Sequence, residues 1–171
     1  MKTKNKNLLL VILLIAVVGM AIGYAALSQQ LVINGTANIT TEWDVHIEGI
    51  TASSDNTANG ATDTTTPTYT ATSATFDVNL AYPGASASYT VYVKNGGTIG
   101  AKLQDVTGVD TANSAEPTGI TYTIDANAND TLASGSTRNY TVTVTWDADA
   151  TQIPETKTKT ATITLNYVQA D

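Results

Sequence analysis

The chain has no cysteine, a single histidine and a single phenylalanine among its 171 residues. Without cysteine there are no disulfides and no thiolate metal sites, so a domain outside the cell must depend on packing and backbone pairing. The one histidine, His46, cannot supply the usual ligand set of a catalytic zinc ion. Basic residues are also scarce, with 8 lysines and arginines against 15 aspartates and glutamates.

The charges are divided unevenly along the chain. All acidic residues follow Leu27, whereas three of the bases, Lys2, Lys4 and Lys6, precede it. The part after Leu27 therefore has 5 bases against 15 acids, a net charge of −10. Such a surface repels nucleic acid and anionic lipid, so we expect no nucleic-acid partner and membrane contact only through the N-terminal segment.

The N-terminus has the three parts of an export signal. Its lysines precede an uncharged apolar stretch, Leu8 to Leu27, and small residues lie near the end of that stretch at Gly23, Ala25 and Ala26. We expect a signal peptidase to cut in this region, so that residues 1–26 are a signal peptide and the protein is secreted or displayed at the cell surface. About 20 apolar residues also suffice to span a bilayer, and the alternative is an uncleaved membrane anchor.

Residues 27–171 alternate apolar and polar side chains with a period of two. From Tyr140 to Trp146 the apolar side chains share one face and threonines the other, which is typical of a strand with one buried face. Matching runs begin at Phe76, Tyr89, Ile120 and Ile163. Turn sequences such as Asn95-Gly96-Gly97 separate these runs. We therefore expect few helices, or none, after Leu27.

The alternating runs and the turn sequences between them predict an all-β fold. We expect residues 27–171 to form one antiparallel two-sheet sandwich of the jelly-roll or immunoglobulin-like type, preceded by the N-terminal hydrophobic signal helix. The tract from Thr51 to Ala74, rich in Thr, Ser, Ala, Asn and Asp, has little to bury. It forms either a long surface excursion or loosely paired edge strands.

Candidate catalytic groups are few. Asp44, His46 and Glu48 alternate with apolar residues, so in a strand they share an outer face where no pocket converges. The chain has no His-Glu-x-x-His pattern, catalytic triad or phosphate loop. The acidic turn from Asp125 to Asp130 lacks the glycine and glutamate of an EF-hand loop, which favours a solvated turn over a surface calcium site. We expect no enzymatic activity, no bound metal and no cofactor.

The aromatic residues raise the alternative of a carbohydrate-binding module. Trp43 and Trp146 are large enough to stack on a sugar, but both continue an apolar strand face, which predicts that they pack in the core. Tyr69, Tyr82 and Tyr92 are better candidates for exposed platforms, although they are scattered along the sequence.

Two regions carry a family resemblance. The first is GYAALSQQLVINGTANI, from Gly23 to Ile39, followed by WDVHI, and the second is Pro83-Gly84 followed by YTVYVKNGG, which ends at Gly97. Together they resemble the TasA/camelysin family of secreted biofilm-matrix fibre proteins. The resemblance implies a jelly-roll sandwich that polymerises by donating an N-terminal strand to its neighbour after a dedicated signal peptidase removes the signal.

The segment behind the signal, residues 27–40, has a pattern that fits strand donation. It is apolar at Leu31, Ile33 and Ile39, with Val32 on the opposite face. Inserted into a neighbouring sandwich, such a strand adds main-chain hydrogen bonds and buries alternate side chains. The alternative is that it forms the first strand of its own sandwich.

We therefore expect a secreted structural protein whose partner is another copy of itself. Repeated head-to-tail exchange of the N-terminal strand builds an open filament, of the biofilm-matrix or pilus-like kind, rather than a closed dimer. One alternative is a monomeric cell-surface domain held by an uncleaved anchor, and a second is the carbohydrate-binding module.

Overall fold

The computed structural model describes residues 2–27, 32–151, 153–155 and 158–170. The chain divides into two compact units, Met1–Ile39 and Thr40–Asp171, which are described separately. The second unit consists mainly of antiparallel β-sheets, and the first contains an apolar helix. The predicted combination of an N-terminal apolar helix with a β-rich remainder is thus confirmed.

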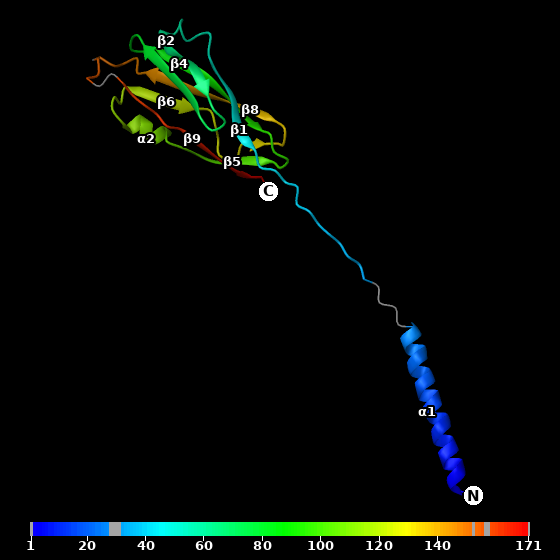
Figure 1. Cartoon of the computed structure of the whole chain (residues 1–171). Helices are drawn as coiled ribbons and strands as arrows, with labels where there is room; N and C mark the ends of the chain where they lie inside the picture. Colours follow the sequence, from blue (N-terminus) through cyan, green and yellow to red (C-terminus); the bar gives the residue numbers. More distant parts are fainter. Residues whose placement is uncertain (1, 28–31, 152, 156–157, 171) are drawn as a thin grey trace. The chain divides into compact units, whose positions relative to one another are not determined.

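In the first unit, helix α1 (Lys2–Leu27) is long and apolar enough to cross a membrane. Its window Asn5–Ile22 has a mean hydropathy of 2.2, and a signal sequence meets the same criterion. All side chains in this window are exposed. Residues 32–44 form neither helix nor strand, and Figure 1 shows the part of this segment in the first unit as an extended trace.

The second unit begins its regular structure at Val45. Its elements are β1 (Val45–Ala52), β2 (Ala61–Tyr69), β3 (Ala74–Leu80), β4 (Ser86–Asn95), β5 (Ala101–Thr107), α2 (Val109–Ser114), β6 (Ile120–Ile124), β7 (Thr131–Leu132), β8 (Thr137–Trp146) and β9 (Thr164–Gln169). The predicted strand runs fall in β3, β4, β6, β8 and β9, so these strand predictions are confirmed.

The strands form three antiparallel sheets, with orders β1-β4-β8-β6, β7-β5-β9 and β2-β3. Alternate residues of β4 and of the central part of β8 are buried, as the period of two requires. Threonines occupy many of the intervening positions, where a β-branched side chain favours the extended backbone and its hydroxyl stays near water. The four-stranded sheet therefore has one apolar face.

The tract from Thr51 to Ala74 contains the end of β1 and all of β2. Strand β2 pairs with β3, but the register shifts between Asp63 and Thr65 and again between Thr65 and Thr68. Most of the β2 side chains are exposed. Of the two expected outcomes, the structure therefore has the loosely paired strands.

The apolar face of the four-stranded sheet packs against residues from the other two sheets. Two core clusters result, one around Val91, Leu103 and Tyr140 and one around Tyr89 and Val144. Phe76 of β3 and Ile163, next to β9, border both clusters. The Phe76 ring stacks on Tyr89 at a centroid distance of 4.0 Å and an interplanar angle of 16°. All three sheets thus contribute to a shared apolar interior.

The chain enters this domain beside the turn between β4 and β5. The Gly96 N–H donates to the Asp44 carbonyl over 2.7 Å, and the Thr98 N–H donates to the Glu42 carbonyl over 3.0 Å. A Cβ atom on Gly97 would lie 2.4 Å from the Glu42 carbonyl oxygen, so only glycine permits this approach. These contacts fix the chain from Glu42 onward.

Candidate functional site

The candidate assembly segment, residues 32–39, exposes its large apolar side chains. Ile33 is 92% exposed, Ile39 is 91% exposed and Val32 is 66% exposed. The described residues from 32 to 41 belong to neither helix nor strand. Leu31, the remaining predicted donor residue, lies outside the described residues. The described part of the segment is thus chain without regular secondary structure whose large apolar side chains are exposed.

An extended conformation gives this segment two unlike faces. Alternation places Ile33, Gly35, Ala37 and Ile39 on one face and Val32, Asn34, Thr36 and Asn38 on the other. The first face has bulky side chains near its ends and small residues between them. Sequence reasoning noted the large residues but missed Gly35 and Ala37, although the same period-two count identifies them.

The predicted cleavage residues Gly23, Ala25 and Ala26 lie at the C-terminal end of α1. Their side chains lie outside the described part of the structure. Cleavage in this region therefore stays a prediction.

Asp44, His46 and Glu48 do not converge on a shared site. His46 Nδ1 lies 2.8 Å from Asp44 Oδ1, whereas Glu48 lies 3.4 Å from the Lys94 ammonium. Glu48 also accepts a hydrogen bond of 2.7 Å from Thr137, and this bond lowers the pKa of its carboxyl group. Within the described ranges, no group of three or more His, Cys, Asp or Glu residues is placed to hold a metal ion.

The acidic turn before β7 uses its carboxylates for internal contacts. Asp130 pairs with Arg138 at 2.8 Å and accepts a hydrogen bond of 3.0 Å from the Asn127 N–H. Asp125 accepts a hydrogen bond of 2.7 Å from the Thr141 N–H. These contacts give both aspartates a structural role in joining the turn to β8.

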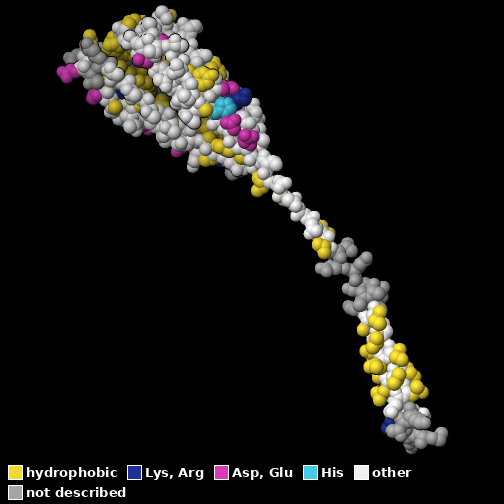
Figure 2. All heavy atoms as spheres, in the orientation of Figure 1, with side chains coloured by type: hydrophobic (Ala, Val, Ile, Leu, Met, Phe, Trp, Pro, Cys, Tyr) yellow, Lys and Arg dark blue, Asp and Glu magenta, His cyan; other side chains and the backbone are white. Residues whose placement is uncertain are grey.

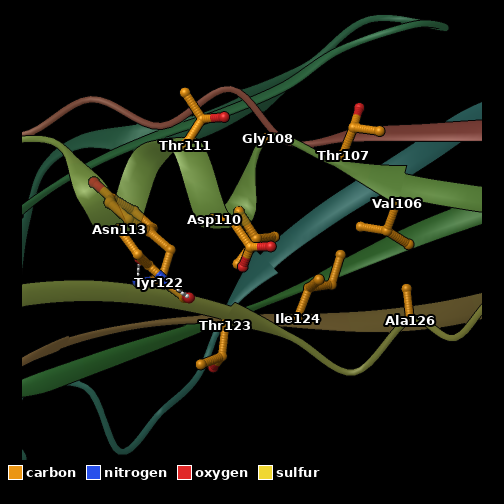
Figure 3. Close-up of a pocket in the computed structure, with 11 residues that line it drawn as sticks. Val106, Thr107, Gly108, Asp110, Thr111, Asn113, Tyr122, Thr123, Ile124 and Ala126 are labelled. Atoms are coloured by element: carbon orange, nitrogen blue, oxygen red, sulfur yellow. Dashed lines mark hydrogen bonds between the residues drawn. The ribbon is translucent and has the colours of Figure 1, made fainter.

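An open hollow of about 540 Å³ lies between α2, the end of β5 and β6. Figure 3 shows Asp110 and Asn113 of α2 on one side and Thr123 and Ile124 of β6 on the other. Asp110 is the one carboxylate among the lining residues, which include no histidine, lysine, arginine or cysteine. The lining thus offers no nucleophile with an adjacent base.

The aromatic side chains separate into exposed and buried groups. Trp43 is 46% exposed, so the prediction that it packs in the core is wrong: β1 begins only at Val45, and Trp43 lies in the segment that passes over Gly97. Trp146 is half-buried, and its Nε1 is buried without a hydrogen-bond partner among the described residues.

The tyrosines proposed as platforms come from different elements. Tyr69, at the end of β2, is 53% exposed, and Tyr82, in the loop after β3, is 50% exposed. Tyr92 is half-buried, and its hydroxyl lies 3.0 Å from the Thr51 hydroxyl. The exposure of Tyr69 and Tyr82 agrees with the sequence-based expectation, whereas Tyr92 is engaged within the sheet.

Four other tyrosines, Tyr89, Tyr122, Tyr140 and Tyr167, are part of the core. Burial raises the pKa of Tyr89, and a short hydrogen bond from its hydroxyl to Asp63 raises the pKa further. Burial likewise raises the pKa of Tyr167, whose hydroxyl lies 2.7 Å from that of Tyr140. These hydroxyls connect the layers: Tyr89 of β4 contacts β2, and Tyr140 of β8 contacts β9.

Comparison with known proteins gives no family assignment. No protein-family model, no curated protein and no solved structure matches this chain.

Proposed function

We propose that this protein is a secreted structural subunit that assembles into extracellular filaments by exchanging its N-terminal strand. The mature chain acts as both donor and acceptor, its partner is another copy of itself, and a signal peptidase releases the donor segment. In this proposal the β-sheets form a jelly-roll-like sandwich that the strand of a neighbouring subunit completes.

The observation that carries the proposal is the state of residues 32–39. They expose Ile33 and Ile39 almost completely and belong to no sheet. Each buried isoleucine side chain contributes about 2–3 kcal/mol relative to an exposed one. A secreted chain that leaves two of them in water within eight residues has a strong driving force to bury them against a partner.

The attachment point and the length of the segment are compatible with exchange between molecules. Hydrogen bonds from Gly96 and Thr98 fix Asp44 and Glu42, so the chain leaves the domain at a defined point. Residues 32–41 then span at most about 35 Å when extended. A segment of this length reaches into an adjacent subunit, and identical contacts repeated head to tail produce an open filament.

Negative-stain microscopy of the secreted, processed protein tests the proposal. Unsubstituted protein and the variant Asn34→Asp should both form filaments, whereas Ile33→Asp should remain dispersed. The two variants add the same charge at neighbouring positions on opposite faces of the segment. Circular dichroism should show that both variants keep their β-structure.

The proposal would be rejected if the unsubstituted protein stayed monomeric, or if Ile33→Asp polymerised as well as Asn34→Asp.

A second candidate function has one observation in its favour, the length and apolarity of α1. If α1 is retained, the protein is a membrane-anchored cell-surface domain. Mass spectrometry of the protein recovered from its host distinguishes the two: an N-terminus after Gly23 supports the secreted subunit, and an intact α1 in the mature protein supports the anchored domain.

A further inference from the structure

The strand edges of the second unit differ in whether another chain can pair with them. An edge accepts an added strand only when its outward N–H and C=O groups are free and its apolar side chains are incompletely covered. The sheets β1-β4-β8-β6, β7-β5-β9 and β2-β3 have six edges in all. Four of these edges, those of β6, β7, β1 and β2, are covered by other parts of the chain or are too irregular to accept a strand.

The β6 edge is closed by side chains. Asn113 Nδ2 donates to the Tyr122 carbonyl over 2.9 Å, and Asn113 Oδ1 accepts from the Tyr122 N–H over 2.7 Å. Two residues earlier, the Ile120 carbonyl accepts from Lys159 Nζ over 2.5 Å, and the Ile120 N–H donates to the Pro117 carbonyl over 3.1 Å. Alternate residues of an edge strand point outward, so these bonds occupy most of the short edge.

Two other edges are occupied by neighbouring parts of the chain. Strand β7 has only two residues, and the carbonyl of Leu132 accepts a hydrogen bond of 3.1 Å from Asn95 Nδ2. On β1, the Ile47 N–H donates to the Ala71 carbonyl over 2.9 Å, and the register of the strand shifts between Ile47 and Gly49. Both features oppose the addition of a regular strand.

The outer edge of β2 has no apolar face to offer. Pro67 lacks an N–H, the register shifts twice along the strand, and its outer part is mainly exposed threonine. Proline and irregular register are the features by which edge strands avoid unwanted pairing.

The edges of β3 and β9 remain. Within the described part of the chain, β3 pairs only with β2, and β9 only with β5. Among the described residues, no hydrogen bond covers the backbone of either strand on its second side. The apolar residues that these strands direct to the core are only half-buried: Phe76, Val78, Leu80, Leu165 and Tyr167. Figure 2 shows hydrophobic side chains gathered in a hollow of the domain surface.

The two open edges lie in the same layer. Phe76 of β3 and Ile163, which precedes β9, border the same two core clusters opposite the four-stranded sheet. Strand β5 occupies one side of β9, and β2 occupies one side of β3. The turn between β2 and β3 lies beside β1, because the Ile47 N–H donates to the Ala71 carbonyl. In Figure 1, β2 and β5 lie at opposite margins of the domain. The free sides of β3 and β9 therefore face each other.

We infer that residues 32–39 of a second copy of this chain bind between β3 and β9 and pair with both edges. This inference rests on the proposed function and names the acceptor. The inserted strand joins β7-β5-β9 and β2-β3 into one continuous sheet opposite β1-β4-β8-β6. The acceptor surface is called the β3/β9 seam below.

The segment and the seam have matching patterns. The segment presents Ile33, Gly35, Ala37 and Ile39 on one face, and this face turns inward over the half-buried core residues. Eight residues extend about 27 Å, close to the roughly 24 Å of the seven-residue β3. The segment carries no charge, so its insertion desolvates no ionised group of its own.

Cysteine cross-linking tests the location of the acceptor, and the natural chain has no cysteine to interfere. Thr36→Cys, on the outward face of the segment, is combined in turn with Thr164→Cys on β9, Asn79→Cys on β3 or Thr123→Cys on β6. All three partner positions are exposed. Assembled protein of each double variant is treated with a short bismaleimide and separated by denaturing electrophoresis.

A covalent ladder of multimers is expected with Thr164→Cys and with Asn79→Cys, and none with Thr123→Cys. A ladder only with Thr123→Cys, or filaments without a ladder in any of the three, overturns the β3/β9 seam while strand exchange stands. Absence of filaments from the unsubstituted protein overturns the proposed function itself. Folding of each variant is checked by circular dichroism before assembly.

Discussion

The side-chain amide of Asn113 makes both hydrogen bonds that a neighbouring strand would make to Tyr122. Its Nδ2 donates to the Tyr122 carbonyl over 2.9 Å, and its Oδ1 accepts from the Tyr122 N–H over 2.7 Å, as the dashed lines of Figure 3 show. The Asn113 side chain thereby occupies the main-chain groups that an added strand would use on β6. The edges of β3 and β9 have no such side-chain contact among the described residues.

Asn113→Ala should destabilise the domain and open the β6 edge. Loss of both bonds leaves two main-chain groups of Tyr122 without a partner, which costs about 1–3 kcal/mol of unfolding free energy. Urea unfolding measures this change. In the Ile33→Asp background, sedimentation velocity should also show new association that does not need the donor segment.

The matched control for this variant is Asn139→Ala, at an exposed position of β8. Equal stability and equal sedimentation of the two variants would show that Asn113 does not protect the edge.

Asn95→Ala should be among the most damaging polar substitutions in the domain. Asn95 is 1% exposed, its Nδ2 donates to the carbonyls of Ile99 and Leu132, and its Oδ1 accepts from the Gly97 N–H. Removal of the amide leaves these buried groups unpaired, and we expect a loss of about 2–4 kcal/mol in unfolding free energy. Thermal and urea denaturation both report it. A loss no larger than that of Asn79→Ala, at an exposed site, would contradict this role.

Gly97→Ala should displace the chain where it enters β1. The added Cβ would lie 2.4 Å from the Glu42 carbonyl oxygen and 2.8 Å from the Asp44 nitrogen, both of which are backbone atoms. Overpacking of this kind costs about 1–3 kcal/mol. Gly119→Ala is the control, because nothing lies within 4 Å of its added Cβ. If the two variants melt at the same temperature, the close approach at Gly97 is not required.

High pH should destabilise the domain through its buried tyrosines. Burial raises the pKa of Tyr89, Tyr122, Tyr140 and Tyr167. These groups stay protonated in the folded state above pH ~10, where tyrosines of the unfolded chain release their protons. Their contribution is therefore complete below pH ~10 and is lost as the pH rises above it. Urea unfolding between about pH 8 and pH 11 measures the decline, and a constant unfolding free energy over this range would exclude it.

Local alternation was sufficient to predict most of the strands. In β8, Tyr140, Val142 and Val144 are buried between exposed or half-buried threonines, as the period of two requires. Alternation does not determine which strands pair, because the pairing of β1 with β4 and of β5 with β9 depends on contacts distant in sequence. Helix α2 was not foreseen either, since its six residues carry no helical apolar stripe.

The position of α2 depends on a tertiary contact. Gly108, which precedes it, has φ of +94°, and a Cβ there would lie 1.9 Å from the Thr162 carbonyl oxygen. The residues around Gly108 do not indicate that Thr162 packs against this position in the fold. Local sequence is also insufficient at Trp43. The alternation of apolar residues predicts that Trp43 is buried, but β1 begins only at Val45 and the side chain is exposed.

The proposed donor segment could be recognised in the sequence, whereas the proposed acceptor could not. Ile33 and Ile39 are distinct in a segment otherwise rich in small and polar residues. The β3/β9 seam is identified because the other strand edges are covered. On β6 the covering side chains, Asn113 and Lys159, come from other segments of the chain, and local sequence does not show that they reach this strand.

Hydrogen–deuterium exchange of the amides of residues 32–39, compared between dispersed and assembled protein, tests the central claim most directly. The account predicts fast exchange in the dispersed subunit and strong protection in the filament, because the segment pairs only within a neighbour. Strong protection in the dispersed subunit at every concentration, or fast exchange in the filament, would contradict it.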